Sequence, residues 1–293
     1  MSSSLRACER AAIPSWCKSS ASGHVIRRAA LPTLLLTVDD LMHLLLTGAT
    51  GTIGNGVLRV ALADPRVTRI SILSRRDFTL PQGIDHSKAE VIVHTDYTQY
   101  PATLLDRLKA QGCSGCIWSL GIPQNQVTKD EYIRITYDYP MAAAKAFSSL
   151  SDRFNFVYVS AGGADQQEKA WSLYGKVKGR AERDLRGLCA TKKHASLRVY
   201  NVRPGPVDPA PGHQRPSFNP FVGAGREAVM GLFRTFASAY VSVTDEMGEV
   251  FVGLAAGNGD PIPPGVGIED GGWLMSVQSI HNAELGNALS LDS

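Results

Sequence analysis

Short apolar segments alternate with amphipathic segments from Met42 to about residue 203, and this alternation constrains the fold more than any other feature. Strands are expected at residues 43–47, 70–73, 90–94, 116–120, 154–160 and 196–202, and helices at 53–63, 102–110, 131–149 and 174–188. Regular alternation of this kind is typical of a parallel sheet with helices on both faces and right-handed connections. The sequence therefore predicts an α/β fold built on a doubly wound parallel sheet.

The pattern changes after Arg203. Residues 204–220 contain six prolines and two glycines, which predicts a loop, and two further helices are expected at 227–240 and 247–256. No sharp change of composition divides the chain beyond Met42. We therefore expect one domain over residues 42–293, in which residues 204–260 form a small substrate cap over the carboxyl edge of the sheet.

The segment that precedes Met42 differs from the rest of the chain. Residues 1–38 are rich in serine and alanine and carry five basic side chains against one acidic side chain. This composition is typical of a mitochondrial targeting segment, and equally of a poorly ordered tail. Because Met42 directly precedes the first strand, residues 1–41 could also be an upstream extension of the reading frame. We leave these interpretations open.

The overall composition excludes several classes of protein. Thirty basic residues against 27 acidic residues give a net charge of +3, without the basic excess that nucleic-acid binding requires. The most apolar stretch, residues 31–46, is interrupted by Asp39 and Asp40 and is shorter than the roughly 20 residues of a membrane span. Five cysteines suit a reducing compartment, so the cytoplasm is expected, with the mitochondrion as the alternative.

The cysteine pair Cys113-x-x-Cys116 is the strongest candidate for redox or metal chemistry. Cys116 lies within an expected strand rather than at a helix start, and no second pair supplies the four ligands of a zinc site. We therefore expect no metal.

A glycine-rich turn joins the first strand to the first helix. It reads Thr47-Gly48-Ala49-Thr50-Gly51-Thr52-Ile53-Gly54, with the spacing G-x-x-G-x-x-G. Gly48 allows the tight turn, Gly51 lets the backbone approach a diphosphate, and Gly54 lets the helix pack closely on the sheet. The free N–H groups of the first helical turn attract an anion. The motif predicts a dinucleotide site formed by Gly48, Thr50, Gly51, Thr52, Ile53 and Gly54.

The end of the second strand indicates which dinucleotide is bound. A site for NAD usually has an acidic residue there, which binds the ribose 2′-hydroxyl. This chain has Arg75 and Arg76 instead, and guanidinium groups suit a 2′-phosphate. We therefore expect NADP(H). Asp96, just after the third strand, is placed to bind the adenine amino group.

Three residues around the fifth strand indicate catalysis. Ser160 ends that strand, and Tyr174 and Lys178 follow at a four-residue spacing on a helix, so they share one helical face. An ammonium group favours the phenolate and would lower the pKa of the tyrosine. Tyr174 could then exchange a proton with a carbonyl or alcohol oxygen, to which Ser160 could donate a hydrogen bond.

Together these motifs resemble the short-chain dehydrogenase/reductase superfamily. The glycine turn, the strand-end serine, Y-x-x-x-K and the turn Arg203-Pro204-Gly205 occur in that superfamily's order over residues 42–210, and Lys178–Glu182 resembles its atypical or extended branch. The resemblance implies a Rossmann-type sheet, bound NADP(H), and catalysis by Ser160, Tyr174 and Lys178. The further cofactor contacts expected are Ser119, Leu120, Gly121, Pro204, Gly205 and Val207, with Val207 near the nicotinamide carboxamide.

The chain departs from the superfamily's pattern at one helix. Many members have an asparagine in the helix before the fifth strand, where it relays protons through water. Here Thr136 occupies that position. A hydroxyl group can still bind water, so Thr136 is the expected substitute.

Three functions remain open at this point. The first is an NADP(H)-dependent oxidoreductase that acts on a carbonyl or alcohol, takes a small-molecule substrate and forms a homodimer. The second is a sugar-nucleotide epimerase or dehydratase, which is disfavoured because only Arg215, Arg226 and Arg234 are basic after residue 204. The third is a non-enzymatic redox sensor; such proteins commonly lose the catalytic tyrosine or lysine, and both are present here.

Overall fold

A computed structural model describes residues 41–213, 227, 229–232, 235, 237, 240–276 and 279. Its main sheet has the strand order β3-β2-β1-β4-β5-β6-β10-β9. Every neighbouring pair is parallel except β10 and β9. The strands are β1 Met42–Thr47, β2 Val67–Ser74, β3 Ala89–Val93, β4 Cys113–Trp118, β5 Phe154–Val159, β6 Leu197–Arg203, β9 Ile268–Glu269 and β10 Leu274–Ser276.

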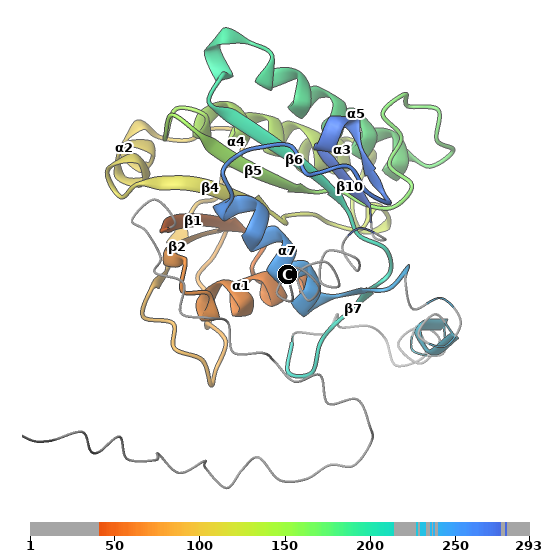
Figure 1. Ribbon diagram of the computed structural model, residues 1–293, viewed down its shortest axis with the longest axis horizontal. Coiled ribbons are helices and arrows are strands. Elements are labelled where there is room, and N and C mark those ends of the chain that lie inside the picture. The colour runs from red at the N-terminus through yellow and green to blue at the C-terminus, as the bar shows by residue number, and fades with distance from the viewer. Residues whose placement is uncertain are drawn as a thin grey trace, which may run out of the picture. The chain divides into compact units, whose positions relative to one another are not determined.

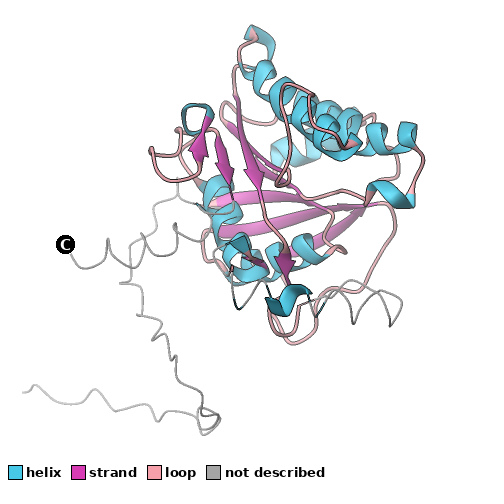
Figure 2. Cartoon of the chain, turned by 90° about the vertical axis from the view of Figure 1, so that its right-hand side faces the viewer, coloured by secondary structure: helices cyan, strands magenta, loops and turns pink. Residues whose placement is uncertain are grey.

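Helices cover both faces of this sheet (Figure 1 and Figure 2). Helices α1 Thr52–Ala63 and α7 Thr244–Ala256 pack on one face, and α2 Ala102–Ala110, α4 Tyr139–Phe147 and α5 Leu173–Cys189 pack on the other. The central strand β1 serves both cores, because Leu44 and Leu46 face α1 and α7 while Leu45 faces the opposite layer. The doubly wound parallel sheet predicted from the alternation is therefore confirmed.

Short elements complete the chain. They are the 3₁₀ turns η2 Gln124–Gln126, η4 Lys192–His194 and η6 Asp270–Gly272, the helix α3 Lys129–Ile133, and a two-stranded sheet of β7 Val207–Asp208 and β8 Ser242–Val243. Strands β9 and β10 were not anticipated, because each is too short for an alternating pattern to identify it. Within the described residues, no helix has the length and apolar character needed to cross a membrane.

The helix expected at 131–149 is divided into three parts. Between α3 and α4 lies a π-helical turn, η3 Arg134–Asp138. In an α-helix the Thr136 carbonyl would accept a hydrogen bond from residue 140, but Pro140 has no N–H group. The Tyr158 hydroxyl donates to this carbonyl instead, at 3.0 Å. A residue distant in sequence therefore supports the irregular turn.

The region expected to cap the sheet lies partly outside the described residues. Its last helix, α7, packs beside α1 on a face of the sheet rather than over the carboxyl edge. Within the helix expected at 227–240, residues 227, 229–232 and 235 are helical. Val229 and Leu232 are exposed, whereas Met230 is buried. Phe233 and Phe236 lie outside the described residues, as do Arg215, Arg226, Arg234 and residues 1–40.

Candidate active site

The glycine turn lies where the strand order reverses, between β1 and β4. Gly48 has a φ of +73°, and the Gly51 N–H donates to the Gly48 carbonyl at 2.9 Å. A Cβ on Gly48 would lie 2.6 Å from the Ser119 carbonyl carbon, and one on Gly54 would lie 2.1 Å from the Gly48 oxygen. Positions 48 and 54 therefore require glycine, because any side chain there would collide with the protein's own backbone.

The start of α1 has the properties of an anion site. Gly51 is the N-cap, no side chain caps the helix, and the first turn, which includes Thr52, Ile53 and Gly54, contains no acidic residue. A helix start leaves its first N–H groups without intrahelical partners, and its dipole favours an anion. Thr50 and Gly51 are exposed beside these groups. The residues present therefore fit the diphosphate of a dinucleotide.

The residues expected near the adenosine end follow β2 and β3. Arg75 and Arg76 are exposed, and neither belongs to an ion pair within the part of the chain that the structure describes. The Ser74 hydroxyl donates to the Arg76 carbonyl at 2.7 Å, which orders this turn. Asp96 accepts hydrogen bonds from the backbone and hydroxyl of Thr98 at 2.9 and 2.5 Å, and these lower its pKa. Asp96 thus shapes its own turn.

The expected contacts on the nicotinamide side lie at the ends of β4 and β6. The Ser119 hydroxyl donates to the Thr47 carbonyl at 2.5 Å, which ties the end of β4 to the end of β1. Leu120 is half-buried and Gly121 is exposed.

The turn after β6 forms hydrogen bonds with two neighbouring segments. The Pro204 carbonyl accepts from the Gly162 N–H at 3.0 Å, and the Gly205 N–H donates to Ser242 Oγ at 3.0 Å. Val207 begins β7, opposite Ser242. These bonds hold the segment at the end of β6.

The structure brings Lys178 to Ser160 at the carboxyl end of β5, with Tyr174 one turn earlier on α5. The Lys178 Nζ donates to the Val159 and Ser160 carbonyls at 2.9 and 3.2 Å. The Ser160 hydroxyl is buried and has no hydrogen-bond partner among the described residues. Tyr174 lies in the first turn of α5, where its N–H donates to Gln124 Oε1 at 2.9 Å. The Ser160 hydroxyl and the Lys178 ammonium group therefore lie at the end of β5, and Tyr174 lies one turn before Lys178 on α5.

The electrostatics of this group differ from the expectation. Burial lowers the pKa of Lys178 to about 8, and the charge of Glu182, one turn further along α5, acts in the opposite direction. Burial raises the pKa of Tyr174. We expected Lys178 to lower the Tyr174 pKa, but the hydrogen bonds of its ammonium group go to strand carbonyls, and the desolvation of Tyr174 dominates.

The sequence of the chain was compared with protein families and with known proteins. No protein-family model matches the chain. It is 36% identical over 181 residues to "Leucinostatins biosynthesis cluster protein T" of Purpureocillium lilacinum, a match that covers 57% of this chain and 65% of that protein. The chain thus spans slightly less than two thirds of that relative. It is 27% identical to "Protein fmp52, mitochondrial" of Emericella nidulans, over 75% of this chain and 90% of that protein.

Solved structures resemble the chain in fold. A short-chain dehydrogenase/reductase family oxidoreductase from Burkholderia thailandensis has a TM-score of 0.56 at 16% identity, over 86% of this chain and 98% of that one. A gluconate 5-dehydrogenase from Burkholderia cenocepacia, solved with NADP and tartrate, has a TM-score of 0.57 at 16% identity, over 82% and 95%. This chain has the Rossmann fold of the short-chain dehydrogenase/reductase superfamily.

The structure shows contacts of Thr136 that could not be predicted from the sequence. Thr136 is buried in the π-helical turn, and its carbonyl is occupied by the Tyr158 hydroxyl. The Lys178 Nζ lies 5.5 Å from the centre of the Tyr158 ring. Tyr158 lies on β5 two residues before Ser160, and this alternate spacing was the signal in the sequence that could have identified Tyr158.

A buried ion pair behind Lys178 was also missed. Arg203 donates to Glu182 from Nε and Nη2 at 2.8 and 2.6 Å, and the Glu182 side chain is fully buried. The pair joins α5 to the end of β6. Glu182 lies four residues after Lys178 on α5, so its helical face was visible in the sequence, whereas its partner was not.

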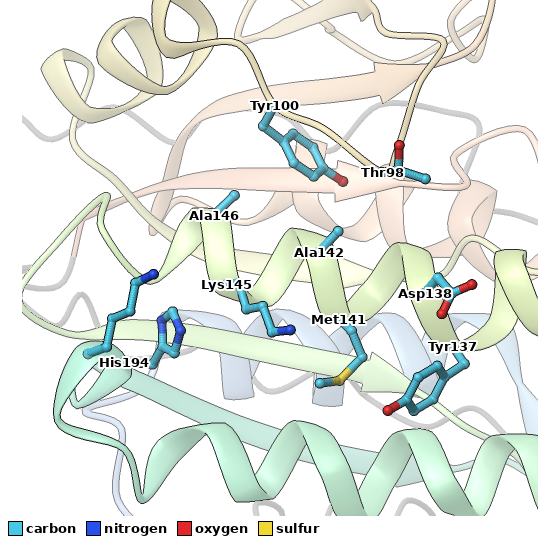
Figure 3. A pocket seen from close by; sticks show the side chains of 10 residues that line it. Thr98, Tyr100, Tyr137, Asp138, Met141, Ala142, Lys145, Ala146 and His194 are labelled. Carbon is cyan, nitrogen blue, oxygen red and sulfur yellow. The ribbon is translucent and has the colours of Figure 1, made fainter.

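The described residues form two hollows that are not lined by any of the expected catalytic or cofactor-binding residues. The first, of about 540 Å³, runs along α4, with Met141 and Lys145 on the helix and Tyr100 and His194 at its sides (Figure 3). The second, of about 700 Å³, is lined by residues 163–167, 169 and 170, which follow Ser160, and by Arg203, Glu269, Asp270 and Leu274. The second hollow adjoins the β5 loop, whereas the first contains no expected site residue.

Within the described ranges, no group of three or more histidine, cysteine or acidic side chains could hold a metal ion. Cys113 and Cys116 are buried in the core, and burial raises the pKa of the Cys113 thiol to about 12. These thiols therefore serve packing in this fold.

Proposed function

We propose that the protein is an NADP(H)-dependent oxidoreductase that transfers a hydride to or from a carbonyl or alcohol substrate. The observation that carries the proposal is the contact of the Lys178 ammonium group with the carbonyl of Ser160, whose buried hydroxyl has no partner among the described residues. Tyr174 lies one turn before Lys178 on α5. The same edge of the sheet carries the glycine turn, at the position where open α/β sheets bind ligands.

Each residue of the group has a distinct task in this proposal. The nicotinamide cofactor, when bound, supplies the hydride. Tyr174 exchanges a proton with the substrate oxygen, because reduction at carbon requires a proton at oxygen. Ser160 donates its unpaired hydroxyl to the same oxygen. Lys178 keeps its positively charged ammonium group at the end of β5 and binds the ribose hydroxyls of the cofactor.

The choice of NADP(H) over NAD(H) rests on Arg75 and Arg76. Both guanidinium groups are exposed at the end of β2 and lack an ion-pair partner in the described part of the chain, so they can bind a 2′-phosphate. The similar structures do not choose between the cofactors. One was solved with NADP, whereas a 3-oxoacyl-[acyl-carrier protein] reductase from Brucella melitensis was solved with NAD.

The direct test is a coupled binding and turnover experiment. Calorimetry measures the affinity of the full chain for NADPH and NADH, and oxidation of NADPH is then followed against a panel of aldehydes, ketones and quinones. The proposal expects binding of NADPH and turnover of at least one carbonyl compound that Tyr174→Phe abolishes. Absence of dinucleotide binding would overturn it.

A second candidate is the non-enzymatic sensor. The raised pKa of Tyr174 favours it, because a tyrosine held protonated by burial transfers its proton less readily. The sensor would bind NADPH normally and turn over no carbonyl compound, and Tyr174→Phe would leave its affinity for NADPH unchanged. The experiment above therefore separates the two candidates.

We also propose a mitochondrial location. The Emericella nidulans relative is named mitochondrial, and residues 1–38 have the composition of a targeting segment. Fusion of residues 1–41 to a fluorescent protein should direct it to mitochondria, while a chain that begins at Met42 should stay in the cytoplasm. Cytoplasmic fluorescence of both fusions would favour the cytoplasm, the location first expected.

A further inference from the structure

The hollow along α4 carries its basic groups at one end. Lys145 on α4 and His194 on η4 lie toward this end, whereas Tyr137 and Asp138 lie toward the other (Figure 3). Lys193, the neighbour of His194, also lines the hollow. Both lysines are exposed, and the ion pairs of the described residues include neither of them. Among the described lining residues Asp138 is the one acid, so no carboxylate balances the charge at the basic end.

Hydrogen bonds orient the His194 ring and leave one of its nitrogens for a ligand. The Ser148 hydroxyl donates to the Lys145 carbonyl at 2.8 Å, and the same oxygen lies 2.7 Å from His194 Nδ1. Because a hydroxyl has only one proton, Ser148 accepts a hydrogen bond from Nδ1–H. His194 Nε2 has no hydrogen-bond partner within the described part of the chain. In its protonated form, His194 therefore presents an N–H donor at Nε2.

The two lysines and His194 interact electrostatically. Burial is the main cause that lowers the pKa of His194, and the charges of Lys193 and Lys145 lower it further. A dianion beside these groups acts in the opposite direction, because a neighbouring negative charge favours the protonated imidazole. The binding of an anion and the uptake of a proton by His194 are therefore linked.

The rest of the hollow has an apolar wall. Ala142 and Ala146 on α4 point toward Tyr100, and Met141 adds to the lining (Figure 3). The Tyr100 ring packs against Phe147, with the ring centres 4.7 Å apart. A volume of about 540 Å³ is that of a small-molecule site and exceeds what a phosphate ion alone fills. The lining therefore fits an anionic group that is attached to an apolar body.

We propose that this hollow binds a phosphomonoester with an apolar body, and that Lys145, Lys193 and His194 Nε2 hold its phosphate group. Lysine binds phosphate as a point charge, and a phosphomonoester carries nearly two negative charges at neutral pH. Asp138 repels a second anionic group at the opposite end. The glycine turn supplies no lining residue, so this site is distinct from the dinucleotide site and does not rest on the proposed oxidoreductase function.

The first test measures the affinity of the full chain for phenyl phosphate and for inorganic phosphate by calorimetry. Phenyl phosphate should bind more tightly, because its ring covers the apolar wall. Lys145→Glu and Lys193→Glu should each weaken its binding by about tenfold or more. Lys192→Glu is the matched control and should keep the affinity, because this exposed lysine lies on the same 3₁₀ turn but does not line the hollow.

The second test follows the titration of His194 by NMR, with the signal identified by its loss in His194→Gln. Phenyl phosphate should raise the pKa of His194 by about one unit. The exposed His86 is the control, and its titration should stay the same.

The inference is overturned by an absence of phenyl phosphate binding, by equal affinities for the two phosphates, by full affinity in the Lys145 and Lys193 variants, or by an unchanged His194 titration. Displacement of phenyl phosphate by NADPH would assign the probe to the glycine turn and would also overturn it. The tests need neither turnover nor a carbonyl substrate, so their outcome is independent of the proposed oxidoreductase activity.

Discussion

The hydroxyl of Tyr158 donates a hydrogen bond to the Thr136 carbonyl at 3.0 Å, and this bond fixes a π-helical turn beside the candidate active site. Pro140 has no N–H group with which to donate to that carbonyl in the α-helical pattern, and the β5 side chain supplies a donor there. The Lys178 Nζ lies 5.5 Å from the centre of the same ring. One tyrosine therefore supports both the helix and the lysine that flank the site.

Tyr158→Phe should lower the free energy of unfolding by about 1–3 kcal/mol. The substitution keeps the buried ring but leaves the Thr136 carbonyl without its partner, and an unpaired buried acceptor costs about that amount. Urea unfolding followed by circular dichroism measures the effect. Tyr100→Phe is the control and should change stability by less than about 0.5 kcal/mol, because its hydroxyl has no hydrogen-bond partner among the described residues. Equal losses in both variants would contradict the role given to the hydrogen bond.

Gly54→Ala should abolish cofactor binding. The new methyl group would lie 2.1 Å from the Gly48 carbonyl oxygen, so α1 must move away from the turn that forms the anion site. Gly187→Ala is the matched control on a helix, because a Cβ there meets nothing within 4 Å. It should leave binding unchanged and stabilise α5 by about 0.5–1 kcal/mol. Calorimetry with NADPH checks both variants, and normal affinity in Gly54→Ala would show that the turn does not hold the diphosphate.

The protein should bind NADPH about tenfold to a hundredfold more tightly than NADH. Hydrogen bonds between a guanidinium group and a phosphate contribute about 1.5–3 kcal/mol, which corresponds to this range. Arg75→Asp should reverse the preference. Arg69→Asp makes the same charge change at an exposed site in the first half of β2 and should preserve it. Calorimetric titrations that coincide for the two cofactors would refute the assignment of Arg75.

Tyr174→Phe should abolish turnover while NADPH still binds, because the substitution removes the exchangeable proton but keeps the ring. Lys178→Ala should weaken both turnover and binding, since its ammonium group has two tasks. Ser160→Ala should reduce turnover less than Tyr174→Phe does. Steady-state kinetics on a confirmed carbonyl substrate, together with calorimetry, measures these effects. Near-full activity of Tyr174→Phe would exclude Tyr174 as the acid–base residue.

Acidification should destabilise the protein through His43. Burial is the main cause that lowers the His43 pKa from 6.5 to about 4, and its ring bonds to Ser71 Oγ at 2.9 Å. A histidine with a depressed folded-state pKa contributes stability above pH 6.5 that is lost as the pH falls towards 4. Between pH 7 and pH 5 the loss is about 2 kcal/mol.

Urea unfolding of the parent chain and of His43→Gln at both pH values isolates this contribution. The difference in stability between pH 7 and pH 5 should be smaller in the variant by about 1–2 kcal/mol. Other groups that titrate in this range contribute to both proteins and cancel in the comparison. The exposed His86 serves as the control, and His86→Gln should keep the pH dependence of the parent. A variant His43→Gln with the same dependence would contradict the prediction.

Periodicity and residue spacing along the chain were enough to predict the succession of strands and helices from β1 to β6. Local periodicity marks each strand and helix, because a strand exposes alternate faces and a helix repeats every 3.6 residues. The glycine spacing at Gly48, Gly51 and Gly54 follows from backbone contacts that only glycine permits. Tyr174 and Lys178 were predicted as a pair for the same reason, since a spacing of four residues on a helix is local geometry.

Interactions between residues distant in sequence became visible only in the folded chain. The bond from Tyr158 to Thr136, the ion pair of Glu182 with Arg203, and the direction of the Lys178 ammonium group all depend on how α5 packs against β5 and β6. The same packing raises the pKa of Tyr174 instead of lowering it, because desolvation depends on everything that surrounds the phenol. No spacing along the chain contains that information.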